Sequence, residues 1–323
     1  MKAVRLHEIG GPQNLVVDDV PQPQPQPDEA LVRVRAGALN HRDVFITQGL
    51  YPNITLPCIL GADGAGEADG KAVVIDPTIG WGSDERVWSL DARILGVPRD
   101  GTFAQYVCVP KENVHEKPEH LSFEEAAALP LAGVTAFRAA FTRGELRGGE
   151  TILITGIGGG VQTFVLLYAK AAGARVAVTS GSDEKLERAR ALGADIAVNY
   201  KTDADWHKTV RKAAGVIDIV VDSAGGESFA KATTIVRPGG RVVTYGGTTG
   251  DAKMRMFPVF WNQVDIRGSS MGSPADFRAM LAFVSTHRIK PVIDRAYEMQ
   301  EIAAAAQRMS QAGQFGKIAI RIP

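Results

Sequence analysis

The feature that most constrains the fold is a regular alternation of short apolar runs and helical segments, which begins near residue 120. Apolar runs of this kind are typical of strands buried on both faces of a parallel sheet, and the intervening helices supply the crossovers. Six such strands indicate a doubly wound α/β sheet. They are expected at residues 151–155, 175–180, 196–199, 217–222, 241–246 and 264–269.

The chain before residue 120 has a different residue pattern. Short strands separated by Pro- and Gly-rich turns predict a compact all-β unit over residues 1–118. Its most biased stretch, QPQPQP at residues 22–27, is interpreted as a stiff surface connection between strands. The tail adds helices around 276–286 and 300–312 and a closing strand, and it is too short for a core of its own. We therefore expect three segments: a first domain over 1–118, a second over 119–260, and a return over 261–323 that carries an edge strand and completes the first domain.

Composition excludes several classes of function. The chain has 36 Lys and Arg against 36 Asp and Glu, so no net field attracts nucleic acid or an anionic membrane. No signal-peptide core and no apolar run of about 18 residues is present, which favours a cytoplasmic protein. The two cysteines, Cys58 and Cys108, are far apart in the sequence, and we interpret them as small buried hydrophobic residues rather than metal ligands.

A glycine-rich turn follows the first strand of the expected sheet and directly precedes a helix. Glycines let the backbone approach a phosphate closely, and the unsatisfied N–H groups at the helix start carry partial positive charge. We therefore place a dinucleotide pyrophosphate here, although the pattern departs from G-x-G-x-x-G at its last glycine. The residues assigned to this site are Gly156, Gly158, Gly159, Gly160 and Val161.

The end of the second strand distinguishes between the two nicotinamide dinucleotides. An acidic residue there would bind the ribose hydroxyls of NADH, whereas this chain has Ser180 followed by Lys185 one helical turn later. The lysine can pair with a 2′-phosphate, so NADPH is favoured over NADH. Asp183 and Glu184 fit an ordinary role facing the helix macrodipole, and a solvated surface lysine is the alternative interpretation of Lys185.

Several blocks, in order along nearly the whole chain, resemble one family. They include GALNHRD, LGADGAG, LPLAGVTAF, ALGADIAVNY, VVDSAGG and GQFGKIAIRI. The chain resembles the medium-chain dehydrogenase/reductase superfamily, in its quinone oxidoreductase-like and zinc-type alcohol-dehydrogenase-like branches. The resemblance implies a GroES-like β-rich catalytic domain, a six-stranded Rossmann domain with NAD(P)H in the cleft between them, and a homodimer formed through the edge strand at residues 264–269.

The same resemblance implies roles for individual residues. Tyr200, with Ser180 and Lys185, matches the pocket around the adenosine 2′-phosphate. Lys317 is expected either near the cofactor phosphates or on the surface. The positions that flank the nicotinamide are matched by Thr135, Tyr245, Gly246 and Thr248.

The metal positions of the zinc-using members are not matched. Asn40, Ala62 and Leu131 stand where the resemblance places the Cys, His and Cys ligands of a catalytic zinc, and neither Ala nor Leu can bind a metal. The stretch corresponding to the lobe of a structural zinc, residues 80–96, contains no cysteine. We therefore expect no metal.

Without a Lewis acid, reduction of a quinone or an α,β-unsaturated carbonyl is easier than direct alcohol oxidation. Candidate groups for a small-molecule substrate are the Asn40 amide and the Tyr51 phenol. His41 is interpreted as a packing or phosphate-side contact, with a proton relay as the alternative, and Asp43 as structural. A zinc-free alcohol or aldehyde oxidoreductase and a non-catalytic NADPH-binding protein are the alternatives.

Overall fold

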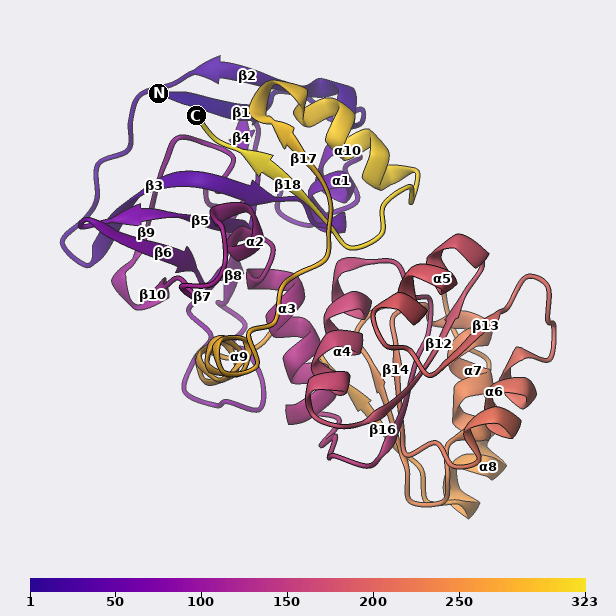
Figure 1. Ribbon diagram of the computed structural model, residues 1–323. Coiled ribbons are helices and arrows are strands. Elements are labelled where there is room, and N and C mark those ends of the chain that lie inside the picture. The colour runs from indigo at the N-terminus through magenta and orange to yellow at the C-terminus, as the bar shows by residue number, and fades with distance from the viewer. The chain divides into compact units, whose positions relative to one another are not determined.

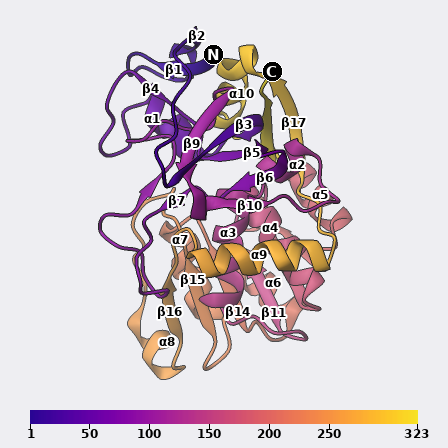
Figure 2. The same cartoon turned by 90° about the vertical axis from the view of Figure 1, so that its left-hand side faces the viewer.

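The computed structural model describes residues 1–323 and divides into two compact units (Figures 1 and 2). The first unit comprises residues 1–134 and 272–323, and the second comprises residues 135–271. The tail from residue 272 therefore belongs to the first unit, whereas the edge strand at 264–269, which the expected return segment of 261–323 included, lies in the second unit. The sequence pattern changes near residue 120, before the boundary between the two units at residues 134–135. The reason is that the helix after residue 120, α2 (Phe123–Ala127), packs on strands of the first unit.

The second unit is built on one parallel sheet whose strand order is β13-β12-β11-β14-β15-β16. All six expected strands are confirmed, two with the expected bounds and four shorter by one or two residues at an end, and the order is that of a doubly wound Rossmann sheet. The strands are β11 (Thr151–Ile154), β12 (Arg175–Ser180), β13 (Ile196–Asn199), β14 (Ile219–Asp222), β15 (Arg241–Thr244) and β16 (Asp265–Gly268).

Helices connect these strands, and in Figure 1 α4 lies on one side of the sheet while α6 and α7 lie on the other. The first strand, β11, is buried along its whole length, as a central parallel strand should be. Ser182 caps α5 by accepting a hydrogen bond from the backbone N–H of Lys185, which confirms the expected cap. The helices are α4 (Gly160–Ala171), α5 (Asp183–Ala191), α6 (Trp206–Ala214), α7 (Gly226–Ile235) and α8 (Met256–Trp261).

The first unit contains a seven-stranded sheet of order β10-β6-β5-β3-β18-β17, with β9 also paired to β3, and smaller sheets β2-β1-β4 and β7-β8. The closing strand β18 pairs antiparallel with β3 and so inserts the tail into this sheet. The strands are β1 (Lys2–Leu6), β2 (Leu15–Asp19), β3 (Glu29–Ala38), β4 (Cys58–Ile59), β5 (Asp63–Ala68), β6 (Lys71–Ile75), β7 (Thr78–Ile79), β8 (Arg93–Ile94), β9 (Tyr106–Pro110), β10 (Val114–Glu116), β17 (Ile293–Glu298) and β18 (Lys317–Arg321).

The first unit is not all β, which corrects the expectation for residues 1–118. Helix α1 (His41–Thr47) follows β3 directly and buries Val44 and Ile46 in the core. The remaining helices are α3 (Pro130–Phe137), which runs across the boundary between the units, α9 (Pro274–Thr286) and α10 (Ile302–Ser310). Residues 22–27 form an exposed connection between β2 and β3, as expected. No helix combines the length and the apolar character that crossing a membrane requires.

Candidate functional site

The glycine turn between β11 and α4 has the backbone geometry that a phosphate site requires. Gly156 and Gly158 have φ angles of 69° and 144°, which other residues rarely adopt. Helix α4 begins at Gly160 with Gly159 as its extended N-cap, so the N–H groups of the first helical turn carry the positive end of the helix dipole. The Ile157 N–H donates to the Thr179 carbonyl at 2.7 Å and fixes the turn to the neighbouring strand β12.

The space above Gly158 is occupied by the side chain of Lys185. A Cβ placed on Gly158 would lie 2.9 Å from Lys185 Cδ and 3.3 Å from its Nζ. Glycine at this position therefore lets the lysine reach back from α5 to the turn. The structure brings Lys185 to the proposed phosphate site, and an anion held by the turn would meet a positive charge there.

A second basic side chain lies at the end of β12. A Cβ on Gly181 would lie 2.8 Å from Lys201 Cε and 3.0 Å from the Tyr200 hydroxyl oxygen, so both side chains cover Gly181. The Tyr200 N–H donates to the Ser180 carbonyl at 3.1 Å. The group expected from the resemblance, Ser180, Lys185 and Tyr200, is therefore clustered around the end of β12. Lys201 was missed by sequence reasoning, and its position directly after Tyr200 was the only signal for it.

Asp222 ties together the ends of three neighbouring strands in the second unit. Its Oδ1 accepts a hydrogen bond from the Thr155 hydroxyl at 2.6 Å, and its Oδ2 accepts one from the Gly225 N–H at 2.8 Å. Its carbonyl accepts the Tyr245 N–H at 3.1 Å. These bonds hold Tyr245 near the glycine turn, and burial raises the pKa of its phenol.

The turn after Tyr245 approaches the end of β14 closely. A Cβ on Gly246 would lie 2.8 Å from the Ser223 carbonyl oxygen, so the close approach requires glycine here. Thr248 lies exposed farther along the same turn, and Thr135 is buried in α3. The nicotinamide-flanking roles of Thr135, Tyr245, Gly246 and Thr248 remain predictions.

In the first unit, Asn40 occupies the N-cap of α1. Its backbone N–H donates to Asp43 Oδ2 at 2.8 Å, and the Asp43 N–H donates to the Asn40 carbonyl at 3.0 Å. Burial raises the pKa of Asp43 to about 6, and the charge of Arg42 opposes that rise. Asp43 thus has the structural role that the sequence indicated, and it fixes the backbone from which the Asn40 side chain projects.

The Asn40 side chain joins a fully buried network with Asp63 and Lys317. The Lys317 ammonium donates to Asn40 Oδ1 at 2.7 Å, to Asp63 Oδ2 at 2.8 Å and to the Leu39 carbonyl at 2.8 Å. The Asn40 Nδ2 group donates to Asp63 Oδ2 at 2.9 Å. An ammonium only donates and a carboxylate only accepts, so this orientation of the Asn40 amide is the one the chemistry requires.

This network corrects the expectation for Lys317. The side chain is buried, not on the surface, and its three N–H bonds all meet acceptors within the first unit. None is left for a cofactor phosphate in this arrangement. Sequence reasoning also missed Asp63, whose only signal was an acidic residue at the start of the small-residue run of β5.

The three positions that the resemblance assigns to zinc ligands converge on Asp63. Asn40 binds its Oδ2, Ala62 precedes it in the chain, and the Leu131 N–H donates to its Oδ1 at 2.8 Å. Ala62 and Leu131 offer no side-chain ligand, and an ammonium already binds the oxygens of Asn40 and Asp63. Repulsion between two cations at those oxygens opposes a metal ion, so the donor set does not fit zinc. No group of three or more His, Cys, Asp or Glu side chains forms a metal site elsewhere.

Tyr51 is not part of this network. The Arg42 guanidinium lies over its ring, 4.8 Å from the centroid, and Arg42 Nε donates to the phenolic oxygen at 3.3 Å. Arg42 is itself held by the Leu95 carbonyl at 2.6 Å. The structure therefore pairs Tyr51 with Arg42 instead of Asn40, and its role as a proton donor remains a prediction.

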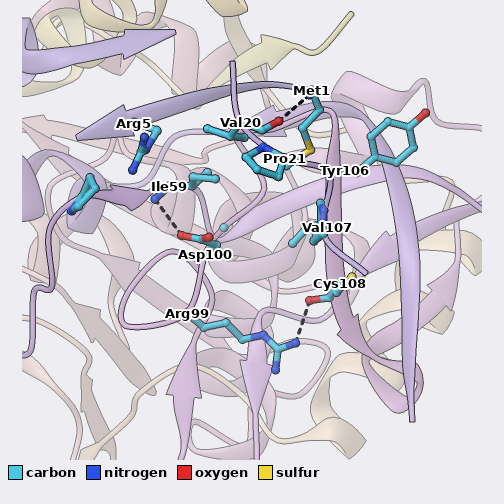
Figure 3. Close-up of a pocket in the computed structure, with 13 residues that line it drawn as sticks. Met1, Arg5, Val20, Pro21, Ile59, Arg99, Asp100, Tyr106, Val107 and Cys108 are labelled. Carbon is cyan, nitrogen blue, oxygen red and sulfur yellow. Dashed lines mark hydrogen bonds between the residues drawn. The ribbon is translucent and has the colours of Figure 1, made fainter. Parts of the chain in front are cut away.

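A cavity of about 420 Å³ in the first unit contains none of the predicted site residues (Figure 3). Its charged groups already have partners: the N-terminal ammonium donates to the Val20 carbonyl at 2.7 Å, Arg99 donates to the Cys108 carbonyl at 3.0 Å, and Asp100 accepts the Ile59 N–H at 3.1 Å. This cavity therefore offers little unpaired charge to orient a reacting molecule.

Comparisons with known proteins agree with this geometry. Residues 26–119 match the family model of the alcohol dehydrogenase GroES-like domain, and residues 160–286 match that of zinc-binding dehydrogenases. A zinc-type alcohol dehydrogenase-like protein, YogA, of Leptosphaeria maculans is 40% identical over 95% of this chain and 94% of its own length. The crystal structure of an NAD-dependent alcohol dehydrogenase, 37% identical, covers 100% of both chains with a TM-score of 0.92. A crotonyl-CoA carboxylase/reductase is 25% identical, with a TM-score of 0.91 over 100% of this chain and 88% of its own.

Proposed function

Because the chain belongs to the medium-chain dehydrogenase/reductase superfamily, as an alcohol dehydrogenase-like oxidoreductase, we propose that it is an NADPH-dependent, zinc-independent reductase of quinones or α,β-unsaturated carbonyls. The observation that carries the proposal is the buried Lys317 ammonium. It binds Asn40, one of the three positions where zinc-using members have their metal ligands, and Asp63, on which those three positions converge.

The preference for NADPH rests on the charges around the end of β12. Lys185 lies over Gly158 and Lys201 lies over Gly181, while no acidic side chain occupies the position of Ser180. A 2′-phosphate placed here would meet two ammonium groups and the hydroxyl of Tyr200. When bound, the nicotinamide cofactor supplies a hydride to the substrate. The chain's own contribution is the phosphate cradle of the glycine turn and these flanking side chains.

Independence of zinc is supported by the cysteines as well as by Lys317. Zinc binds the thiolate form, whereas burial raises the pKa of the Cys58 thiol to about 11 and also raises that of Cys108. Cys58 pairs in β4 with β1 and packs in the core, and it belongs to no group of three or more His, Cys, Asp or Glu side chains that could hold a metal ion. Both thiols are therefore poor candidates to replace the absent ligands.

The substrate class follows from what the first unit can stabilise. Conjugate reduction places negative charge on the carbonyl oxygen, and that charge needs a hydrogen-bond donor when no metal is present. Asn40 Nδ2 carries two N–H bonds and gives one to Asp63, so the other can bind the substrate oxygen. Hydride addition at the conjugated carbon and proton uptake from water at the adjacent carbon complete the reduction. The name of the crotonyl-CoA carboxylase/reductase describes chemistry on such a conjugated carbonyl.

A homodimer through the Rossmann sheet is part of the proposal. The edge strand β16 pairs only with β15, and Ile266 on it is exposed. Just before it, α8 exposes Phe257, Phe260 and Trp261, with Phe257 stacked on Trp261 at 5.5 Å between ring centroids. An unpaired strand edge next to an exposed aromatic patch favours pairing with a second copy about a two-fold axis.

The names of several relatives favour a second candidate, direct interconversion of alcohols and aldehydes. Steady-state assays with NADPH separate the two when a panel of quinones and enones is run beside a panel of aldehydes, with the zinc content of the same preparation measured. Turnover of conjugated substrates by zinc-free protein supports the proposal. Turnover of aldehydes alone, or a requirement for stoichiometric zinc, contradicts it.

A further inference from the structure

We infer that Lys317 is a positioning residue of this reductase: its buried ammonium polarises and orients the Asn40 amide, so that a fixed positive charge reinforces the hydrogen bond to the substrate oxygen. The inference rests on the proposed function and adds an electrostatic residue to it. Lys317 and Asn40 are 277 residues apart in the chain, and β18 brings them together by pairing with β3.

The Lys317 ammonium polarises the Asn40 amide toward its oxygen. Lys317 Nζ lies 2.7 Å from Asn40 Oδ1 and withdraws electron density from that end of the amide. The ammonium also neutralises the Asp63 carboxylate, which accepts from the same Nδ2 group at 2.9 Å and whose charge would otherwise weaken Nδ2 as a donor to a negatively charged oxygen. With that charge offset, the second Nδ2 hydrogen is the stronger donor, since hydrogen bonds in a chain strengthen one another in a low-dielectric interior. A substrate oxygen that gains negative charge during reduction gains more from such a donor than a neutral carbonyl does, which is the differential binding that lowers a barrier.

The network of Asn40, Asp63 and Lys317 is held in one arrangement. Asp63 is completely buried, and its Oδ1 is held by the Leu131 N–H while its Oδ2 receives both Asn40 and Lys317. Every acceptor that Lys317 meets lies on fixed elements, β5 and the residues joining β3 to α1. The Asn40 amide therefore cannot rotate without breaking two hydrogen bonds to charged groups, so its donor is preorganised.

The inference is tested with variants that separate charge from folding. Lys317→Met alone strands Asp63 as a buried unpaired charge and destabilises the chain. The double variant Asp63→Asn with Lys317→Met removes both charges while keeping residues of similar size. The matched control, Asp294→Asn with Arg308→Met, removes another ion pair of the first unit, one in which Asp294 is buried. NADPH oxidation is measured with 2-cyclohexenone and with 1,4-naphthoquinone, and thermal unfolding is recorded in parallel.

We expect the Asp63→Asn, Lys317→Met protein to fold and its kcat to fall roughly 10- to 100-fold, no more than the loss caused by removing a direct oxyanion donor. Its KM for NADPH should be unchanged. The control pair should keep its kcat. In Lys317→Ala, n-propylammonium, which replaces the missing part of the side chain, should restore kcat, whereas tetramethylammonium, which has no N–H, should not.

Two results would overturn the inference: wild-type kcat in the folded double variant, or a raised KM for NADPH with kcat intact, which would place the lysine at the cofactor. Absence of turnover by the wild-type protein on every carbonyl and quinone is a different outcome. It would refute the proposed function itself and, with it, the premise of this inference.

Discussion

The cofactor site gives a prediction whose size can be worked from the structure. In Lys185→Ala the backbone N–H of residue 185 still donates to the Ser182 cap, so α5 keeps its start and only the ammonium beside Gly158 is lost. A hydrogen bond to a charged group contributes about 1.5–3 kcal/mol, which corresponds to roughly 10- to 150-fold in affinity. Because Lys185 is only half-buried, solvent screening places the expected loss near the lower end, about 10- to 30-fold.

The assay is isothermal titration of the full chain with NADPH and with NADH at one ionic strength. We expect the dissociation constant for NADPH to rise by that factor while that for NADH changes less than about twofold. Lys208→Ala is the matched control, since Lys208 is an exposed helical lysine of the same unit that pairs with Asp205 at 3.0 Å. Equal weakening of both cofactors, or the same loss in the control, would refute the placement of a 2′-phosphate at Lys185.

Three further predictions concern cofactor choice, pH and assembly. Ser180→Asp should favour NADH over NADPH in the same titration, because the carboxylate binds ribose hydroxyls and repels the 2′-phosphate. Burial raises the pKa of Asp76 from 3.8 to about 7, so its folded form binds the extra proton and stability falls as pH rises from about 4 to 7. The stability of Asp76→Asn relative to wild type, measured by thermal unfolding, should therefore rise across that pH window, by up to about 4 kcal/mol at pH 8. A stability difference between the two proteins that does not change with pH would contradict this. If the proposed dimer forms, wild-type protein should sediment as a dimer and Trp261→Glu as a monomer, without loss of NADPH binding; a wild-type monomer would contradict the dimer.

The Rossmann sheet could be predicted from sequence because its strands are continuous apolar runs with local signals at their ends. The cap at Ser182 and the glycine turn are likewise local patterns, since a few neighbouring residues determine their geometry. Helix α1 was missed because seven residues beginning His-Arg-Asp show too little helical periodicity, and its burial comes from contacts with distant strands.

The network around Asp63 could not be predicted for a different reason. Its members come from the residues joining β3 to α1, from β5 and from β18, and Lys317 meets Asp63 across 254 residues of sequence. Nothing local to the GKIAI segment distinguishes a buried lysine from one at a cofactor phosphate. The family likeness pointed to the correct region through Asn40, Ala62 and Leu131, but only the fold shows that an ammonium occupies it.

The central claim is that metal-free protein moves a hydride from NADPH to the conjugated carbon of an unsaturated carbonyl. The most direct measurement is a single turnover of chelator-treated protein with NADPH carrying deuterium at the transferable C4 position and with 2-cyclohexenone as acceptor, followed by mass and NMR analysis of the product. We predict a saturated ketone with deuterium at the carbon β to the carbonyl. Deuterium on the carbonyl carbon of an alcohol, or transfer only after zinc is restored, would contradict the claim.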